Sequence, residues 1–412
     1  MIREACSACN HDVLLTFLDL DTSPVADAYA ATVEESLDLE RYPLNVAVCA
    51  KCYLVQLMEV LPSTLLFGTG YSFYTSASPP LSRYHEVYAQ EVLARNPGLA
   101  GKSVLEIGCN DGDLLRHFQL AGCQTLGVDP ATGPVEVARN RGLDVRVRPF
   151  GEAFARDLHE VGGPATLILA NHVLAHVADV SDMLAGISIM LDWDGLAMIE
   201  VQYLPDLLVN NAFDLVYHEH RNFFSLTTLE SAALRHGLHL VDVKFTMRQG
   251  GSIRATFTKG DAVSEAGNMV THTERWLQSL STYESFQGRV NRIRERLWDL
   301  VVAEGDRTIA GYGAPAKATT LLNFCRMSGV LSHVIDTTPA KQGRYIPGTD
   351  IQIRDPDLES NFSISNLHGA TVYREGVDTY MLLSWNYLPE ILHKEKDFSG
   401  RWIVPIPSPM VF

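Results

Sequence analysis

Short apolar runs alternate with helix-like intervals through the middle of the chain. Between about residue 102 and residue 260, the runs SVLEI, TLGVD, DVRVR, TLILA and LAMIEV are each followed by a more polar stretch. The runs LHLVDVKF and GGSIRATFTK then close the series. Because buried parallel strands read as short apolar runs joined by long crossovers, this order predicts a mostly parallel sheet covered by helices.

A second alternating series occupies the C-terminal part. A helix-favouring stretch over residues 264–304 precedes the strand-like runs RTIAGYG, SHVIDTT, DTYMLLSW and RWIVPIP. The first 68 residues show few periodic patterns and lead into an aromatic and hydroxyl-rich link, GTGYSFYTSASPP. We therefore expect an α/β protein with domains at residues 1–68, 69–260 and 261–412.

Composition narrows the class of protein. A formal net charge of -16 over 412 residues argues against binding along nucleic acid, which needs clustered Lys and Arg. The start, MIREACSACNHDV, has no apolar signal core, and no apolar run approaches a membrane span. Cys109, Cys123 and Cys325 lie singly, as in reduced intracellular proteins. We expect a soluble cytoplasmic protein, compatible with a monomer, without nucleic-acid or membrane partners.

The other four cysteines form two CxxC pairs, Cys6 with Cys9 and Cys49 with Cys52. A CxxC knuckle holds two thiolates, and two knuckles complete the tetrahedral shell that zinc prefers. Two unrelated thiol pairs remain the alternative, while a redox dithiol is disfavoured because no thioredoxin-like unit surrounds either pair. Four protein ligands would make the zinc site structural rather than catalytic.

The segment VLEIGCNDGDLL carries the strongest signal for a cofactor. A predicted strand ends at Glu106, a glycine turn runs through Gly108 and Gly112, and a helix begins at Asp113. The next strand ends at Asp129. That is about 20 residues on, the spacing at which an acidic residue meets a ribose in dinucleotide folds.

Two cofactors compete for this loop. NAD would place its diphosphate where Asn110 and Asp111 put an amide and a carboxylate, and charge repulsion disfavours that arrangement. The pattern ExGxNxG instead resembles motif I of class I S-adenosylmethionine-dependent methyltransferases, whose cofactor carries no phosphate. The expected cofactor-binding residues are Glu106, Gly108, Asn110, Asp111, Gly112, Asp129, Pro130, Phe150 and Asn171.

Four proton-handling side chains adjoin in FDLVYHEHRNFFSL, residues 213–226. As a metal site the group is incomplete, because His218 and His220 would point to one side of a strand and Glu219 to the other. As an acid/base site, an imidazole beside a carboxylate and a phenol suits removal of a proton next to a carbonyl. Structural histidines remain a further alternative. His176 of NHVLAHVADV follows a predicted strand, at the edge where open α/β sheets bind ligands.

These motifs resemble one family over essentially the whole chain, the sugar C-methyltransferases that act on dTDP-linked keto-deoxysugars in antibiotic-sugar biosynthesis. The resemblance rests on the cysteine pairs, VLEIGCNDGDLL, NHVLAHVADV, YHEHRNFFSL, RQGGSIR, IAGYGAPAKATTLLNF and DTTPAKQGRYIPGT. It implies a small zinc-binding N-terminal domain, a central class I methyltransferase domain and a C-terminal Rossmann-like α/β domain. The implied reaction moves a methyl group from S-adenosylmethionine to a carbon next to a ketone.

The resemblance also implies catalytic roles for His220, Glu219, Tyr217, His176, Tyr74 and Tyr71. The second histidine of YHEH corresponds to the family's base, which would form an enolate that attacks the methyl group in line. The tyrosine and glutamate of YHEH would orient the base or the enolate, and the histidine of LAHV would assist. The two tyrosines of YSFYTS are candidate phenols on the substrate side.

Four positions depart from the family pattern. Phe73 and Phe223 stand where tyrosine is common, Thr75 replaces a serine, and His172 stands where asparagine is frequent. These changes leave the implied base in place, but they leave open which sugar is bound and which tyrosine contacts it.

The C-terminal glycines allow further interpretations. GYGAPA, residues 311–316, resembles a dinucleotide fingerprint, and Asp336 ends the next predicted strand. An NAD-dependent oxidoreductase would use this loop; alternatively it lies on the substrate side, with Lys317, Lys341 and Arg344 facing a nucleotide diphosphate or forming a solvated basic rim. A methyltransferase acting on oxygen or nitrogen is the nearest rival function, because such an acceptor needs less base chemistry.

Overall fold

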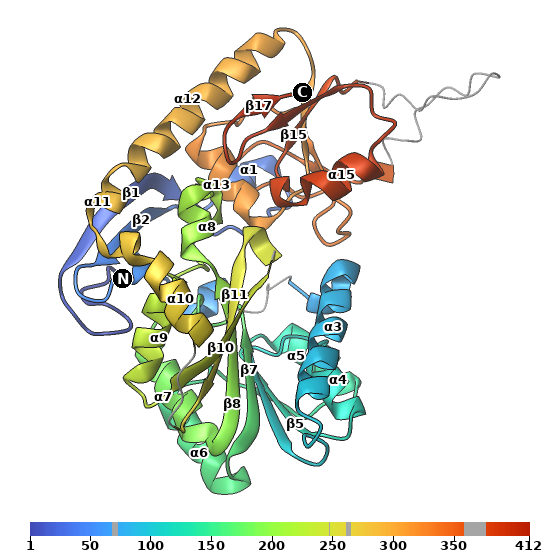
Figure 1. Ribbon diagram of the computed structural model, residues 1–412. Coiled ribbons are helices and arrows are strands. Elements are labelled where there is room, and N and C mark those ends of the chain that lie inside the picture. The colour runs from blue at the N-terminus through green and yellow to red at the C-terminus, as the bar shows by residue number, and fades with distance from the viewer. Residues whose placement is uncertain (68–72, 247, 261–264, 358–375) are drawn as a thin grey trace. The chain divides into compact units, whose positions relative to one another are not determined.

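The structure is a computed structural model that describes residues 1–67, 73–246, 248–260, 265–357 and 376–412 (Figure 1). The chain forms two compact units whose segments alternate along the sequence. Unit 1 comprises Met1–Leu15, Ala47–Pro205 and Arg221–Ser279, and unit 2 comprises Thr16–Val46, Asp206–His220 and Leu280–Phe412. The domain boundaries expected at residues 68 and 260 stay a prediction. In the described part of the chain, no helix is both long and apolar enough to cross a membrane.

Unit 1 is built on a sheet whose described strands have the order β10-β11-β8-β7-β4-β5-β6. Strands β4 to β8 run parallel, and β11 lies antiparallel between β8 and β10. The strands are β4 Ser103–Ile107, β5 Gln124–Asp129, β6 Val145–Val147, β7 Ala165–Asn171, β8 Leu191–Gln202, β10 His239–Thr246 and β11 Ser252–Thr258. The order reverses between β4 and β7, so their carboxyl ends form the switch point where such sheets bind ligands.

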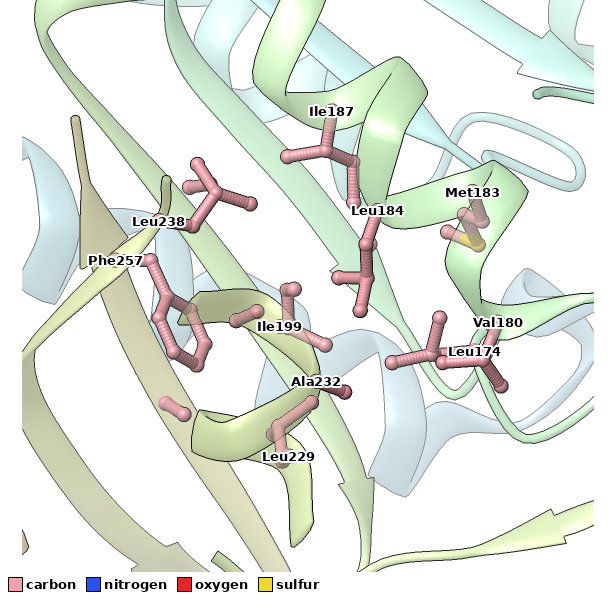
Figure 2. Packing of buried hydrophobic residues seen from close by; sticks show 14 of the residues in the cluster. Leu174, Val180, Met183, Leu184, Ile187, Ile199, Leu229, Ala232, Leu238 and Phe257 are labelled. Carbon is pink, nitrogen blue, oxygen red and sulfur yellow. The ribbon is translucent and has the colours of Figure 1, made fainter. Parts of the chain in front are cut away.

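Alternate residues of the central strands enter two separate cores, because successive side chains of a strand point to opposite faces. On β7, Ile168 and Ala170 pack with helices α6, α7 and α9, whereas Leu167 and Leu169 pack with α3, α4 and α5. Figure 1 shows these two helix groups on opposite sides of the sheet, and Figure 2 shows the first core around Ile199 of β8. The helices are α3 Pro79–Arg95, α4 Leu115–Leu120, α5 Thr132–Asn140, α6 Glu152–Gly162, α7 Val180–Met190 and α9 Leu226–Leu234.

A smaller sheet has the order β1-β2-β3-β9, with β3 antiparallel to β9. Its strands are β1 Leu14–Ser23, β2 Tyr42–Cys49, β3 Val55–Leu57 and β9 Asn222–Phe223. Strands β1 and β2 each contribute residues to both units. The remaining short elements outside the C-terminal segment are α1 Val33–Leu37, α2 Ser63–Leu66, α8 Leu204–Val209, α10 Glu265–Thr273, and the 3-10 turns η1 Thr75–Ala77, η2 Phe213–Leu215, η3 Arg248–Gly250 and η4 Arg275–Gln278.

Unit 2 has its own sheet, with the order β14-β13-β12-β15-β16-β17 among the described strands. All neighbours are parallel except β16 and β17. The strands are β12 Ile309–Tyr312, β13 Val334–Ile335, β14 Ile353–Arg354, β15 Thr379–Leu382, β16 Arg401–Val404 and β17 Met410–Val411. The helical elements are α11 Ser281–Glu284, α12 Phe286–Glu304, α13 Ala316–Phe324, η5 Trp385–Tyr387 and α15 Leu388–Lys394. The expected α/β class, with two mostly parallel sheets, is confirmed.

Candidate active site

The loop after β4 is held by the carboxylate that ends β5. Asp129 accepts hydrogen bonds from the backbone N–H of Asn110, at 2.9 Å, and of Ala131, at 2.8 Å. Burial raises the pKa of Asp129, and these backbone N–H groups partly oppose the shift. One carboxylate therefore joins the ends of β4 and β5, at the position where the sequence predicts contact with a ribose.

Both glycines of this loop have left-handed backbone, with φ of +71° at Gly108 and +77° at Gly112. A Cβ at Gly108 would lie 2.2 Å from Cγ2 of Val173, and one at Gly112 would lie 2.1 Å from Cδ1 of Leu143. Packing and backbone conformation therefore require both glycines, in addition to any approach of a ligand. The contact with Val173 also brings the loops after β4 and β7 together.

Two polar side chains at the switch point have unsatisfied atoms. Oε2 of Glu106 and both Oδ1 and Nδ2 of Asn171 are buried without a hydrogen-bond partner among the described residues. Burial raises the pKa of Glu106 well above its usual value, and the nearby Asp113 adds to the shift. Because buried polar atoms are nearly always hydrogen bonded, this arrangement fits a polar cofactor such as S-adenosylmethionine.

The side chains of Asn110 and Asp111 hold the segment that precedes α3. The Asn110 amide donates to the carbonyl of Phe73 and accepts from the N–H of Thr75, both at 3.0 Å. The fully buried Asp111 accepts from the Thr75 hydroxyl and, at 3.1 Å, from the N–H of Ser76. These two side chains position a neighbouring segment, and their direct contact with the cofactor stays a prediction.

The hydrogen bonds of Asn110 and Asp111 place Tyr74 next to the start of α5. A Cβ at Gly133 would lie 2.8 Å from the Tyr74 hydroxyl. Tyr71, the other candidate phenol, lies outside the described residues. Of the other expected cofactor residues, Pro130 is exposed beside Asp129, and the Phe150 ring packs against α7.

A buried network that the sequence motifs missed surrounds Glu200 of β8. Its carboxylate accepts hydrogen bonds from the Tyr84 hydroxyl, at 2.6 and 2.7 Å, and from Nε of Arg254, at 2.9 Å. Nε2 of His172 lies 3.2 Å from its Oε1. Burial raises the pKa of Glu200, but His172, Arg254 and Tyr84 together outweigh burial and lower it to about 2. The available signal was a charged residue inside each of the apolar strand patterns LAMIEV and SIRATFT.

In unit 2, the YHEH segment places His220 between two hydrogen-bond partners. Nδ1 of His220 lies 2.8 Å from the Leu215 carbonyl, and Nε2 lies 2.7 Å from the Tyr217 hydroxyl. The two rings lie 3.9 Å apart between centroids. Because a carbonyl only accepts, Nδ1 carries a proton, so the Nε2 lone pair accepts from the tyrosine.

His218 and Glu219, the other two residues of YHEH, have different surroundings. Nε2 of His218 lies 3.2 Å from the Pro43 carbonyl, and its ring meets Tyr42 edge-on. Burial raises the pKa of Glu219 to about 8, and the neighbouring Asp27 adds to the shift. Among the described residues, a cluster of three or more ligands close enough for one metal ion occurs only at the four cysteines, so a metal site at YHEH is not supported.

The raised pKa of Glu219 predicts a pH-dependent stability. The folded state binds this proton more tightly than the unfolded chain, so the contribution is fully present below the usual carboxyl pKa of 4.5 and is lost as the pH rises to about 8. We expect Glu219→Gln to reduce the fall in the urea unfolding midpoint between those pH values. The exposed Glu390→Gln on α15 is the control, and parallel profiles for all three proteins would contradict the assignment.

The glycine loop of unit 2 repeats the arrangement seen in unit 1. Asp336, at the end of β13, accepts a hydrogen bond of 2.7 Å from the N–H of Ala314. Gly313 has a φ of +83°, and a Cβ there would lie 2.1 Å from Oγ of Ser384. Lys341 donates to the Ala314 carbonyl at 2.8 Å.

Lys317 of α13 is buried rather than facing solvent. Its ammonium donates to Asn386 at 2.7 Å, stands 3.8 Å from the centre of the Trp385 ring and lies 3.8 Å from Asp214. Burial lowers its pKa to about 8, against the opposing effect of Asp214. A solvated basic rim is therefore wrong for Lys317, because the tryptophan and the carboxylate enclose its side chain. Arg344, in contrast, is exposed, and its guanidinium donates to the Tyr29 carbonyl at 3.1 Å.

The four cysteines of the two CxxC pairs form one cluster in unit 1. Sγ atoms of Cys6 and Cys52 lie 3.5 Å apart, those of Cys9 and Cys49 lie 3.6 Å apart, and all four fall within 4.8 Å of one another. Tetrahedral zinc with bonds of about 2.3 Å requires sulfur separations of about 3.8 Å, which these distances fit. The cluster is thus a structural zinc site.

The two knuckles share one backbone geometry. Asn10 and Tyr53 directly follow the second cysteine of each pair and have left-handed φ values of 55° and 61°. Each donates its N–H to the carbonyl of the first cysteine of its pair, at 2.9 and 3.0 Å. The convergence of all four sulfur atoms, with this repeated geometry, argues against two unrelated thiol pairs.

Three family models match successive parts of the chain. They are described as "Putative zinc binding domain" over residues 6–67, "Methyltransferase domain" over residues 81–243 and "C-methyltransferase C-terminal domain" over residues 247–407.

Individual proteins are similar to all or part of this chain. The C-methyltransferase NovU of Streptomyces niveus is 34% identical over 420 residues, which cover 99% of this chain and 96% of NovU. A ubiquinone biosynthesis O-methyltransferase of Azorhizobium caulinodans is 31% identical over 121 residues, 27% of this chain and 48% of that protein. The solved magnesium protoporphyrin IX methyltransferase from Synechocystis PCC 6803 is 15% identical, with a TM-score of 0.35. The matched region covers 48% of this chain and 92% of the chain of that structure.

The similarity to NovU extends over both units, and the zinc cluster and the cofactor loop lie within the matched regions. The expected cofactors, S-adenosylmethionine and structural zinc, are thereby confirmed. The chain belongs to the same family as NovU, the S-adenosylmethionine-dependent C-methyltransferases.

Proposed function

We propose that this C-methyltransferase methylates a carbon next to the ketone of a dTDP-linked keto-deoxysugar, with His220 as the base. The sugar class follows the resemblance of the sequence motifs to enzymes of antibiotic deoxysugar biosynthesis. The choice of His220 as the base is supported by its two hydrogen bonds. Nδ1 donates to the Leu215 carbonyl, and Nε2 accepts from the Tyr217 hydroxyl. The proposal places the protein in the cytoplasm, in keeping with seven cysteines that form no disulfide.

Carbon methylation needs a base because a C–H carbon has no lone pair. S-adenosylmethionine supplies an electrophilic methyl group when bound. Nε2 of His220 takes the proton α to the ketone, and the Leu215 carbonyl stabilises the resulting imidazolium through Nδ1–H. The Tyr217 hydroxyl, released from Nε2, donates to the ketone oxygen and stabilises the enolate. Glu106, Asp129 and Asn171 would hold the cofactor, whose methyl group the enolate carbon would accept.

Glu219 and His176 have supporting roles in this proposal. With a pKa raised to about 8 by burial, Glu219 is mostly protonated at neutral pH and adds no second negative charge beside the enolate. His176, whose ring meets Phe67 edge-on, assists in acceptor binding, as do Tyr74 and Tyr71.

A nucleotide-linked acceptor is supported by contacts within unit 2. The Thr320 hydroxyl of α13 donates to the Val216 carbonyl at 2.8 Å, and Trp385 donates to Asp214 at 2.6 Å. The first contact anchors the segment that carries the base to α13, the helix that follows the glycine loop, and the second anchors it to η5. The N-terminus of such a helix favours an anion, so we propose that this loop contacts the nucleotide diphosphate.

The test is mass spectrometry after incubation with methyl-labelled S-adenosylmethionine and a panel of dTDP-4-keto-deoxyhexoses in heavy water. We expect one labelled methyl group to appear on carbon in one of these sugars. Solvent deuterium without methylation would show that the base acts but that the panel lacks the true acceptor. Transfer to oxygen, or neither signal despite cofactor binding, would contradict the proposed acceptor.

A further inference from the structure

The loop after β7 contains a strained residue next to the cofactor loop. His172 has a left-handed φ of 54°, and its N–H donates to the Glu200 carbonyl at 2.7 Å. Residues other than glycine adopt this conformation rarely, and such outliers gather at functional sites. Asn171, with its unsatisfied amide, precedes it, and Val173, which packs on Gly108, follows it. His172 therefore sits at the switch point of the sheet.

The imidazole of His172 is held from one side only. Nε2 lies 3.2 Å from Oε1 of Glu200, a carboxylate that is fully buried and also bound by Tyr84 and Arg254. Arg254 itself is fixed by the Tyr84 hydroxyl, at 2.7 Å, and by the Tyr88 ring, whose centre lies 3.2 Å from its guanidinium carbon. Because a carboxylate accepts, the neutral ring carries its proton on Nε2.

This tautomer leaves Nδ1 as an acceptor. None of the described residues hydrogen-bonds Nδ1 of His172, and the side chain is 19% exposed. A buried ion-pair network that ends in a partly exposed imidazole beside the cofactor loop can orient an incoming hydroxyl group.

We propose that His172 is a specificity-determining residue for the methyl acceptor, accepting a hydrogen bond at Nδ1 from an acceptor hydroxyl. Glu200 is a positioning residue that acts through His172, and Tyr84 and Arg254 hold Glu200. The inference rests on the proposed function, since it requires an acceptor with a hydroxyl group near the reacting carbon, as a deoxysugar has.

The test compares His172→Asn, Glu200→Gln and the double variant in the methyl-transfer assay with the sugar that the unaltered protein methylates. Asparagine tolerates left-handed backbone, so the loop conformation should be kept while the hydrogen bond to Glu200 is lost. We expect the KM for the sugar to rise about tenfold in either single variant, kcat to change much less, and the double variant to be no worse than His172→Asn. The dissociation constant of S-adenosylhomocysteine should stay unchanged.

The control is His236→Asn, which removes a unit 1 histidine that lies 3.0 Å from the Ser181 hydroxyl. It should leave both constants unchanged. A lower melting temperature with an unchanged KM for the sugar would show that the network is only structural and would overturn the inference. Weakened S-adenosylhomocysteine binding with an unchanged KM would overturn it too, because His172 would then serve the cofactor.

A second measurement needs no acceptor. In protein labelled with 15N-histidine, at an alkaline pH where imidazoles are neutral, we expect His172 to carry its proton on Nε2. A proton on Nδ1 would overturn the inference. Failure of the unaltered protein to methylate any sugar would instead count against the proposed substrate class, while the tautomer still decides the role of His172.

Discussion

Replacement of His220 by asparagine is expected to abolish methyl transfer while affinity for S-adenosylhomocysteine is kept. The substitution removes the nitrogen that would take the α proton, and positioned bases of this kind contribute about a hundredfold to ten-thousandfold in rate. The cofactor loop after β4 is held by the Asp129 carboxylate through two backbone N–H groups, so we expect cofactor binding to be kept. Rates come from single-turnover assays, and affinity comes from calorimetry.

Deuterium exchange separates the two steps. With S-adenosylhomocysteine in place of the methyl donor, the unaltered protein should exchange the α hydrogen of its sugar with heavy water, and His220→Asn should not. His218→Asn is the matched control, since His218 lies against the Pro43 carbonyl. It is expected to lower the melting temperature but to keep turnover per folded molecule. Full exchange by His220→Asn would assign the base to another group.

Replacement of Cys49 by serine is expected to release the zinc ion and to destabilise the protein. Cys49 ends β2 with its side chain fully buried, so its loss opens the shell that joins the two knuckles. Structural zinc contributes about 10 kcal/mol or more of apparent binding free energy in zinc-finger peptides. Even a loss of about 4 kcal/mol would lower the melting temperature by about 5 °C. Metal content is measured by mass spectrometry and stability by calorimetry.

Cys123→Ser provides the matched control for the zinc prediction. Cys123 is also a buried cysteine of unit 1, and its thiol donates to the Leu99 carbonyl away from the cluster. This variant should keep one zinc ion per chain. A zinc-free Cys49→Ser protein with an unchanged melting temperature would show that the metal is dispensable for folding.

Elements with local signals could be predicted from the sequence, whereas elements made by distant contacts could not. The stretch over residues 264–304 reads as helix, but α10 ends at Thr273. The next side chain, Glu274, instead accepts from the backbone N–H of Leu226 and Thr227, at 2.8 and 2.7 Å, at the start of α9. A tertiary cap thus ends a helix that local propensity would have extended.

The candidate site shows the same division. The hydrogen-bond partners of His220, Leu215 and Tyr217, lie within five residues of it along the chain, whereas its role as the base stays a proposal that comes from the resemblance. Tyr84 and Glu200, by comparison, are 116 residues apart and share no motif. The pattern of hydrophobic positions likewise does not predict that the segments of the two units alternate along the chain. Asp206–His220, for example, belongs to the same unit as the C-terminal part.

The sequence by itself determined the two α/β series, the cofactor loop with Asp129, the four cysteines and the resemblance to C-methyltransferases. Each depends on periodicity or spacing within a short segment, which the covalent chain dictates directly. Only the tertiary structure decided that Asn110 and Asp111 hold the segment of Tyr74, that Lys317 is buried, and that His172 is braced by Glu200. These arrangements arise because buried charges and amides must find partners, and the partners that folding brings to them lie far away in the chain.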